Sequence, residues 1–148
     1  MNDVSATGFS LQLRASVTFP SGFGITMFAD DADPFDLPVV NAAEVASDIN
    51  GNMISWSTPT PQQVTINVVP GSEEDQNLSI LLEANIAKRG RRHAGDVITL
   101  VGTYADGSTT IGRNGKILSG SRGKSVASAG RLKTKVYTLA FQDFDQTR

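Results

Sequence analysis

The sequence contains no cysteine among its 148 residues. Disulfide bonds, thiolate nucleophiles and cysteine-based metal sites are therefore excluded. No apolar run approaches the roughly 20 residues that a membrane-spanning helix needs, so we expect no membrane insertion by this chain. The first ten residues, MNDVSATGFS, lack the basic start and the apolar segment of a secretory signal. These absences favour a chain that folds and assembles in a cytoplasm.

Histidine is almost absent too, which leaves little for catalysis. The single histidine, His93, lies in the basic segment KRGRRHAGD, and nothing in the sequence marks a serine and a carboxylate as its triad partners. None of the fifteen acids is singled out by its spacing as part of a glycosidase pair. We therefore predict a protein that is not an enzyme and that uses no cofactor.

One glycine-rich segment ends like a phosphate-binding loop. Gly123, Lys124 and Ser125 match the end of the pattern G-x-x-x-x-G-K-[ST], but Leu118 stands where the first glycine is required. The flanking residues favour strand and loop, whereas this motif joins a buried strand to a helix. We therefore predict that this segment is a basic loop that does not bind a nucleotide.

An acidic segment resembles a calcium loop only superficially. Asp31, Asp33 and Asp36 have suitable spacing at first sight, but the EF-hand pattern needs glycine at its sixth position and glutamate at its twelfth. Counted from Asp31, those positions hold Asp36 and Ala42. We predict no metal site, and we interpret the segment as an exposed acidic interface loop.

Strand patterns dominate the N-terminal half. Residues 9–19 alternate strictly between apolar and polar side chains, which predicts one long strand with a buried and a wet face. A turn is expected at residues 20–22, followed by a second extended run. Residues 30–52 are expected to be mostly loop, with a short helical turn near 42–46. Two further strands are expected within residues 53–59 and 62–72.

One helix is predicted, over about residues 73–89. Ser72 is a suitable N-cap, and acids follow it in the first turn. Apolar residues recur at helical spacing, and a basic stretch ending in Gly90 closes the pattern. The helix should pack on a sheet through the residues of its apolar face, which are Leu78, Leu81, Leu82 and Ile86.

The C-terminal part predicts a hairpin over residues 95–120, a flexible loop rich in small residues over 119–130, and a final strand that begins at Leu132. About seven strands and one helix result, without a large repeat. We therefore predict a single, mainly β domain over residues 1–148, built as a β-sandwich or partly open barrel with one packing helix and long inter-subunit loops.

Charge is distributed unevenly along the chain, whose net charge is −2. Residues 1–87 sum to −10, with Arg14 as their one cation, and residues 88–148 sum to +8. Each half could simply solvate its own surface, or opposed surfaces could meet between copies of the chain. A third interpretation is a nucleic-acid-binding β-barrel that uses the basic C-terminal half, although this half offers few aromatic side chains for base stacking.

The stretch SVASAGRLKTKVYTLAFQDF, with the chain length and the long alternating strand, resembles tail tube proteins of contractile-tailed bacteriophages, which are related to the tubes of contractile injection systems. The resemblance implies hexameric rings that stack into a tube inside a sheath. It implies a hairpin or loop that reaches the adjacent ring, and an acidic channel that conducts double-stranded viral DNA. The sheath protein, the tape-measure protein and the transiting DNA would then be partners, in a virion tail.

Two groups of residues are predicted to lie at subunit interfaces, where opposite charges on neighbouring copies would meet. The first is a basic arm formed by Arg113, Lys116, Arg122, Lys124 and Arg131. The second is an acidic loop formed by Asp30, Asp31, Asp33 and Asp36. The alternatives that stay open are the nucleic-acid-binding barrel and a tail-completion or joining protein that forms a single ring.

Overall fold

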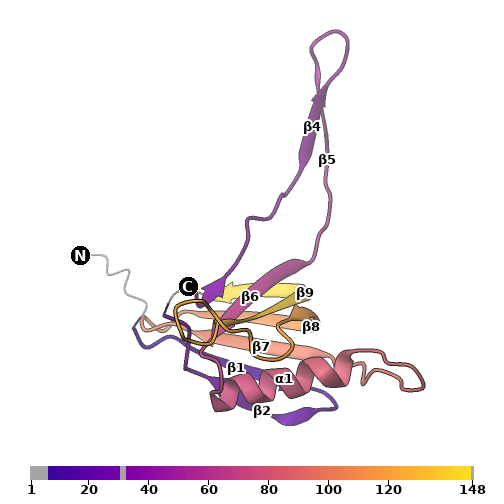
Figure 1. Cartoon of the computed structure of the whole chain (residues 1–148). Coiled ribbons are helices and arrows are strands. Elements are labelled where there is room, and N and C mark those ends of the chain that lie inside the picture. The colour runs from indigo at the N-terminus through magenta and orange to yellow at the C-terminus, as the bar shows by residue number, and fades with distance from the viewer. Residues whose placement is uncertain (1–6, 31–32, 148) are drawn as a thin grey trace.

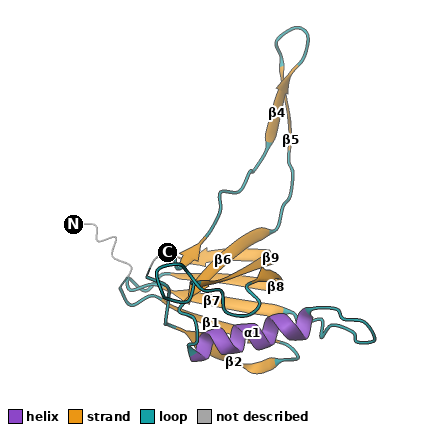
Figure 2. Cartoon of the chain, in the orientation of Figure 1, coloured by secondary structure: helices purple, strands orange, loops and turns teal. Residues whose placement is uncertain are grey.

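The structure is a computed structural model that describes residues 7–30 and 33–147 (Figure 1). It is mainly β, with one helix laid against a large sheet (Figure 2). In chain order the elements are β1 (Ser10–Ala15), β2 (Phe19–Ile25), β3 (Phe35–Asp36), β4 (Glu44–Ser47), β5 (Met53–Trp56), β6 (Gln62–Val68), α1 (Glu73–Asn85), β7 (Ile98–Thr103), β8 (Thr109–Gly120) and β9 (Lys135–Thr147).

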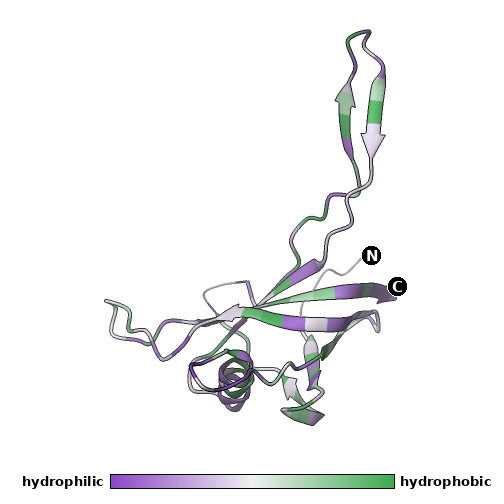
Figure 3. Ribbon diagram, turned by 90° about the vertical axis from the view of Figure 1, so that its right-hand side faces the viewer, coloured by the Kyte–Doolittle hydropathy of each residue, from purple (hydrophilic) through white to green (hydrophobic). Residues whose placement is uncertain are grey.

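Seven strands form one sheet in the order β2-β1-β7-β8-β9-β6-β3, and every neighbouring pair is antiparallel. The sheet curls around α1, which is seen end-on in Figure 3. The two remaining strands, β4 and β5, form a separate hairpin that projects from the body. The predicted partly open barrel with one packing helix is confirmed.

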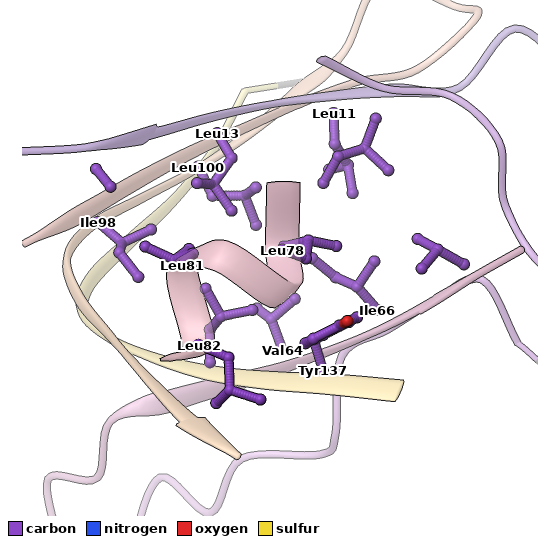
Figure 4. Packing of buried hydrophobic residues seen from close by; sticks show 14 of the residues in the cluster. Leu11, Leu13, Val64, Ile66, Leu78, Leu81, Leu82, Ile98, Leu100 and Tyr137 are labelled. Carbon is purple, nitrogen blue, oxygen red and sulfur yellow. The ribbon is translucent and has the colours of Figure 1, made fainter. Parts of the chain in front are cut away.

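The core lies between the helix and the concave face of the sheet. Leu78, Leu81 and Leu82 of α1 are buried between two wings of the sheet (Figure 4). Leu11, Leu13, Ile98 and Leu100 come from one wing, and Val64, Ile66 and Tyr137 from the other. A curled sheet therefore buries this short helix on more than one side, and apolar burial of this kind is the main stabilising term in folding.

The helix begins where the sequence predicts and ends earlier. The Ser72 side chain accepts a hydrogen bond from the backbone N–H of Asp75 at 3.2 Å, as an N-cap does. The helix then stops at Asn85 instead of residue 89, because Ile86 is already extended. Asn85 explains this end: its amide donates to Asp96 at 2.8 Å and its carbonyl accepts from the Asp96 N–H at 3.0 Å.

The long first strand predicted over residues 9–19 is wrong, because the chain turns back after Ala15. The backbone N–H groups of Val17 and Thr18 donate to one carboxylate oxygen of Asp96 at 2.8 and 2.9 Å, and the Thr18 hydroxyl donates to the other at 2.5 Å. Ala15 then pairs with Phe19 across a tight hairpin. A side chain about 80 residues away thus fixes this turn, so local alternation could not show it.

Three further expectations differ from the structure. The turn expected at residues 20–22 is wrong, because these residues lie inside β2. The helical turn expected near residues 42–46 is wrong, because β4 occupies Glu44–Ser47 and pairs with β5. The last strand begins at Lys135, and Leu132 makes only an isolated bridge with Val126. The hairpin expected over residues 95–120 is present as β7 and β8.

Candidate assembly surfaces

A long arm, residues 37–61, carries β4 and β5 away from the sheet (Figure 1). Its tip is closed by Asp48, whose carboxylate accepts from the backbone N–H groups of Asn50 and Asn52 at 2.9 and 2.8 Å. Hydrogen bonds from the side chain and the backbone of Asn52 are the main reason that the pKa of Asp48 lies below its usual value. Lower on the arm, the Trp56 indole donates to Glu44 at 3.0 Å.

The arm exposes apolar side chains along both strands, which appear as green segments in Figure 3. Ile49 at the tip is 100% exposed and Val39 near the base is 96% exposed. An isolated two-stranded hairpin is at best marginally stable in water, and grouped apolar exposure marks interaction surfaces. The other large exposed apolar residues of the arm are Val40, Val45, Met53, Ile54 and Trp56.

The convex face of the sheet, which points away from α1, is polar with little net charge. Serine, threonine and glutamine dominate it, as at Gln12, Thr99, Thr138 and Thr65, whose strand neighbours face the core. Its charged residues balance, with three cations and three carboxylates. These are Arg14, Arg113, Lys116, Asp36, Asp143 and Asp145.

Both outer edges of the sheet are strands with little cover. At one edge β2 has β1 as its single strand neighbour in the sheet order. At the other edge β3 contributes two residues, which pair with Thr65 and Ile66 of β6. Residues 27–29 cover the C-terminal end of β6 through a bridge between Phe28 and Val68. Among the described residues, this leaves the part of β6 at residues 62–64 without an outer backbone partner. Such edges present backbone N–H and C=O groups that can pair with another chain.

The residues predicted as a basic arm do not form one cluster. On β8, Arg113 pairs with Asp145 at 3.1 Å and Lys116 donates to the carbonyl of Gly95 at 3.3 Å. Lys124 is exposed on the loop before β9. These three residues therefore lie on separate parts of the sheet and the loop.

The two loop arginines bind acids of their own chain. Arg122 reaches Glu83 of α1 with two hydrogen bonds of 2.7 and 3.2 Å, and Arg131 reaches Asp30 at 3.3 Å. The pKa values of Glu83 and Asp30 lie below their usual values, and the hydrogen bond from the arginine is the largest cause in each case. The Arg131–Asp30 pair joins the predicted basic arm to the predicted acidic loop.

The remaining acidic-loop residues lie along the edge of the sheet. The backbone carbonyl of Asp33 accepts from the Asn67 amide at 2.5 Å, and Asp36 is in β3 opposite Thr65. Asp31 lies outside the described residues. The exposure expected for this loop holds for Asp30, Asp33 and Asp36.

The sequence interpretation missed the hairpin arm as a surface. One signal was present: Asn50-Gly51 separates two runs that contain Val45, Ile54 and Trp56. Asn-Gly between such runs is a strong hairpin signal. The many prolines and aspartates around it favoured a loop instead, and the sequence alone could not show that this hairpin leaves the body.

Residues 7–30 and 33–147 contain no group of three or more histidine, cysteine, aspartate or glutamate side chains that could hold a metal ion. Over the same ranges, no helix is both long and apolar enough to cross a membrane.

Comparisons with known proteins agree with this architecture. Three solved structures share the fold at low identity, and two of them match over nearly their whole length. A chain described with the PVC sheath/tube terminator of an extracellular contractile injection system has a TM-score of 0.61 at 15% identity, covering 100% of this chain and 99% of that one. A chain of the anti-feeding prophage baseplate has a TM-score of 0.60 at 12% identity, covering 99% and 96%. A chain of the anti-feeding prophage tube-terminating cap has a TM-score of 0.56 at 12% identity, covering 99% and 92%.

No curated protein matches the chain. A family model described as tail fiber protein gp32 matches residues 2–145, which is almost the whole sequence. The expected resemblance to tail proteins is confirmed by this match, which supports a structural role in a tail. The solved structures show that the fold is shared with a component of a contractile injection system. The chain belongs to the tail fiber protein gp32 family.

Proposed function

We propose that this protein is a self-assembling subunit of a contractile-type tail, whose copies form hexameric rings that stack into a tube for viral DNA. The observation that carries the proposal is the projecting arm. Seven of its large apolar side chains are 47–100% exposed in the described chain. Burial of apolar surface contributes about 25 cal/mol per Å², so covering the arm with a neighbouring copy would make association of the two copies more favourable.

The sheet edges support closure into a ring. The β2 edge of one copy can pair with the open part of the β6 edge of the next, because both present backbone groups to the outside. Such a contact is heterologous, and it generates a closed ring when the rotation between copies closes. Six sheets joined in this way would form one continuous wall.

The convex face suits a water-filled lining. It is rich in hydroxyl and amide side chains, and its cations and carboxylates are equal in number. Proteins that hold nucleic acid do so largely by neutralising phosphates with lysine and arginine, so a balanced wall would let a duplex pass without strong binding. The resemblance implies an acidic lining, whereas this face is close to neutral because Arg14, Arg113 and Lys116 offset its acids.

The partners expected of such a tube are a sheath on the outside and a tape-measure protein and DNA on the inside. The similar structures are described as a sheath/tube terminator, a baseplate and a tube-terminating cap. These neighbours support assembly beside sheath and tube components, in the tail of a virion or a related particle.

The test is removal of the arm. Pro38 and Gln62 lie close together, since the Gln62 amide donates to the Pro38 carbonyl at 3.3 Å, so a four-residue glycine-serine linker can replace residues 39–61. We expect the purified wild-type chain to form rings or tubes of constant width in negative-stain micrographs. The shortened chain should remain a folded monomer by circular dichroism and sedimentation.

A milder variant tests the apolar surface itself. Val45→Ser, Ile49→Ser and Met53→Ser together should abolish assembly, whereas Ser47→Thr with Ser55→Thr, on the same strands, should preserve it. Single rings that never stack would favour the tail-completion alternative. A wild-type chain that stays monomeric and binds DNA in a salt-sensitive manner would overturn the proposal.

A further inference from the structure

A basic turn, residues 88–92 with the sequence KRGRR, projects beyond the end of α1 (Figure 1). It is closed by two backbone hydrogen bonds between Lys88 and Arg91, of 3.3 and 3.0 Å. Gly90 has a φ of 75°, a left-handed conformation that favours glycine at this position. The fold thus holds four cations together on a tight, exposed turn.

Most of this charge has no partner within the described chain. Lys88 reaches Glu83 at 3.2 Å, but Glu83 also binds Arg122 at 2.7 Å. Arg89, Arg91 and Arg92 are exposed, and no acid of residues 7–30 or 33–147 pairs with them. Like charges this close repel one another, so an acidic partner would relieve a repulsion that the isolated chain retains.

The opposite end of α1 carries several acids, beside two cations: Lys124 lies near Gly71, and Arg131 is paired with Asp30. Glu73 and Glu74 begin α1, and Glu74 accepts from the Thr26 hydroxyl at 3.3 Å, just beyond the end of β2. Asp33 lies beside the end of β6, through the contact of its carbonyl with Asn67. None of these three acids has an ion pair among the described residues. The thirteen-residue helix separates this end from the basic turn by about 20 Å at 1.5 Å per residue.

Asp106 belongs to the same end. It lies in the turn between β7 and β8, next to Tyr104, whose ring is 4.9 Å from that of Phe9. Phe9 in turn contacts Phe35, two residues after Asp33, at 5.1 Å. We name the group Asp33, Glu73, Glu74 and Asp106 the acidic end.

We propose that the basic turn of one copy binds the acidic end of a second copy. The two surfaces carry opposite charges, and they lie at opposite ends of α1, so one contact leaves the second copy with its own basic turn available for a third. This head-to-tail geometry propagates. We call this contact between two copies the joint. The proposal rests on the proposed function, because the joint is a specific contact within the self-assembly argued there.

Duplex DNA is the competing partner, and the chain favours a second copy over it. The acidic end supplies one matched surface per basic turn. The turn contains no aromatic side chain on which a base of a single strand could stack, and a duplex would be held through its phosphates alone. DNA binding by the turn is therefore an outcome that the experiment must distinguish.

The experiment uses two charge-reversed variants of the full chain. The turn-reversed variant carries Arg89→Glu, Arg91→Glu and Arg92→Glu, and the acid-reversed variant carries Asp33→Lys, Glu73→Lys and Asp106→Lys, which makes the acidic end net positive. Each variant alone should associate at least tenfold more weakly than wild type in sedimentation at low salt. An equimolar mixture should recover association, because each joint between unlike copies then has opposite charges on its two surfaces. The conservative variant Arg89→Lys, Arg91→Lys, Arg92→Lys should behave like wild type.

The outcomes separate the two proposals. If wild type assembles and the turn-reversed variant assembles equally well, the joint is wrong while the tube proposal stands. If the mixture fails to recover, the two surfaces do not meet, and the joint is again wrong. Loss of duplex DNA binding with unchanged assembly would assign the turn to nucleic acid. If wild type does not associate at any salt concentration, the proposed function itself fails.

Discussion

The ammonium group of Lys135 lies 3.4 Å from a carboxylate oxygen of Asp75, and the two side chains are only 4% and 3% exposed. The Tyr137 hydroxyl is 2.9 Å from the same oxygen and 2.8 Å from the Ser79 hydroxyl. The second Asp75 oxygen accepts from the backbone N–H of Gly71 at 2.9 Å. Burial raises the pKa of the Tyr137 phenol well above its usual value, so the hydroxyl stays protonated. This network ties the start of β9 to the first turns of α1.

Replacing Lys135 by methionine should strongly destabilise the fold. Removal of one partner of a buried ion pair costs about 3–5 kcal/mol, because the other charge stays buried. Urea denaturation followed by circular dichroism measures the loss in the free energy of unfolding. Lys133→Met, the same change at an exposed position two residues earlier, should alter it by less than about 0.5 kcal/mol. Equal effects of the two changes would contradict a buried network.

The stability of the chain should fall in acid partly through Asp96. Burial opposes ionisation of this carboxyl, but hydrogen bonds from Thr18, Asn85 and Val17 outweigh it and hold the pKa of Asp96 below its usual value. Because the folded pKa lies below the unfolded one of about 4, the stabilisation is complete above pH 4 and is lost as pH falls through the folded pKa. Thermal unfolding between pH 2 and pH 6 checks this sign. Asp96→Asn should be less stable than wild type at pH 6 and should show a weaker acid dependence, and parallel curves would refute the assignment.

An alanine at Gly115 should be poorly tolerated. A Cβ there would clash with the Phe141 ring, which covers this part of β8. Overpacking of this kind typically costs about 1–3 kcal/mol. Adding Phe141→Leu should recover part of the loss, since a smaller side chain vacates the space. A double-mutant cycle on unfolding free energies measures this coupling. If the effects of the two changes simply add, the Phe141 ring is not what excludes a Cβ at Gly115.

Trp56 can report on assembly, since it is the single tryptophan and lies on the arm at 48% exposure. If neighbouring copies cover the arm, its fluorescence emission should shift to shorter wavelength and acrylamide should quench it less as rings form. The Val45→Ser, Ile49→Ser, Met53→Ser variant, held as a monomer, provides the control spectrum. An emission that stays constant while wild type assembles would place the interface elsewhere.

Local sequence patterns predict most of the elements. Ser72 with the acids after it defined the start of the helix, because capping and charge at a helix N-terminus are local effects. Alternation of apolar residues defined the buried faces of β1 and β9, since side chains in a strand point to opposite faces by turns. The absence of cysteine and of catalytic patterns also favours a structural protein.

Long-range contacts set where these elements end and which surfaces stay uncovered. Asp96 fixes both the turn after Ala15 and the end of α1 through contacts that span up to 79 residues, and a local pattern contains no trace of such partners. The arm shows the same limit, because its apolar residues look like those of a core strand in sequence. Their exposure follows from where the hairpin leaves the sheet, and long-range packing alone sets that position.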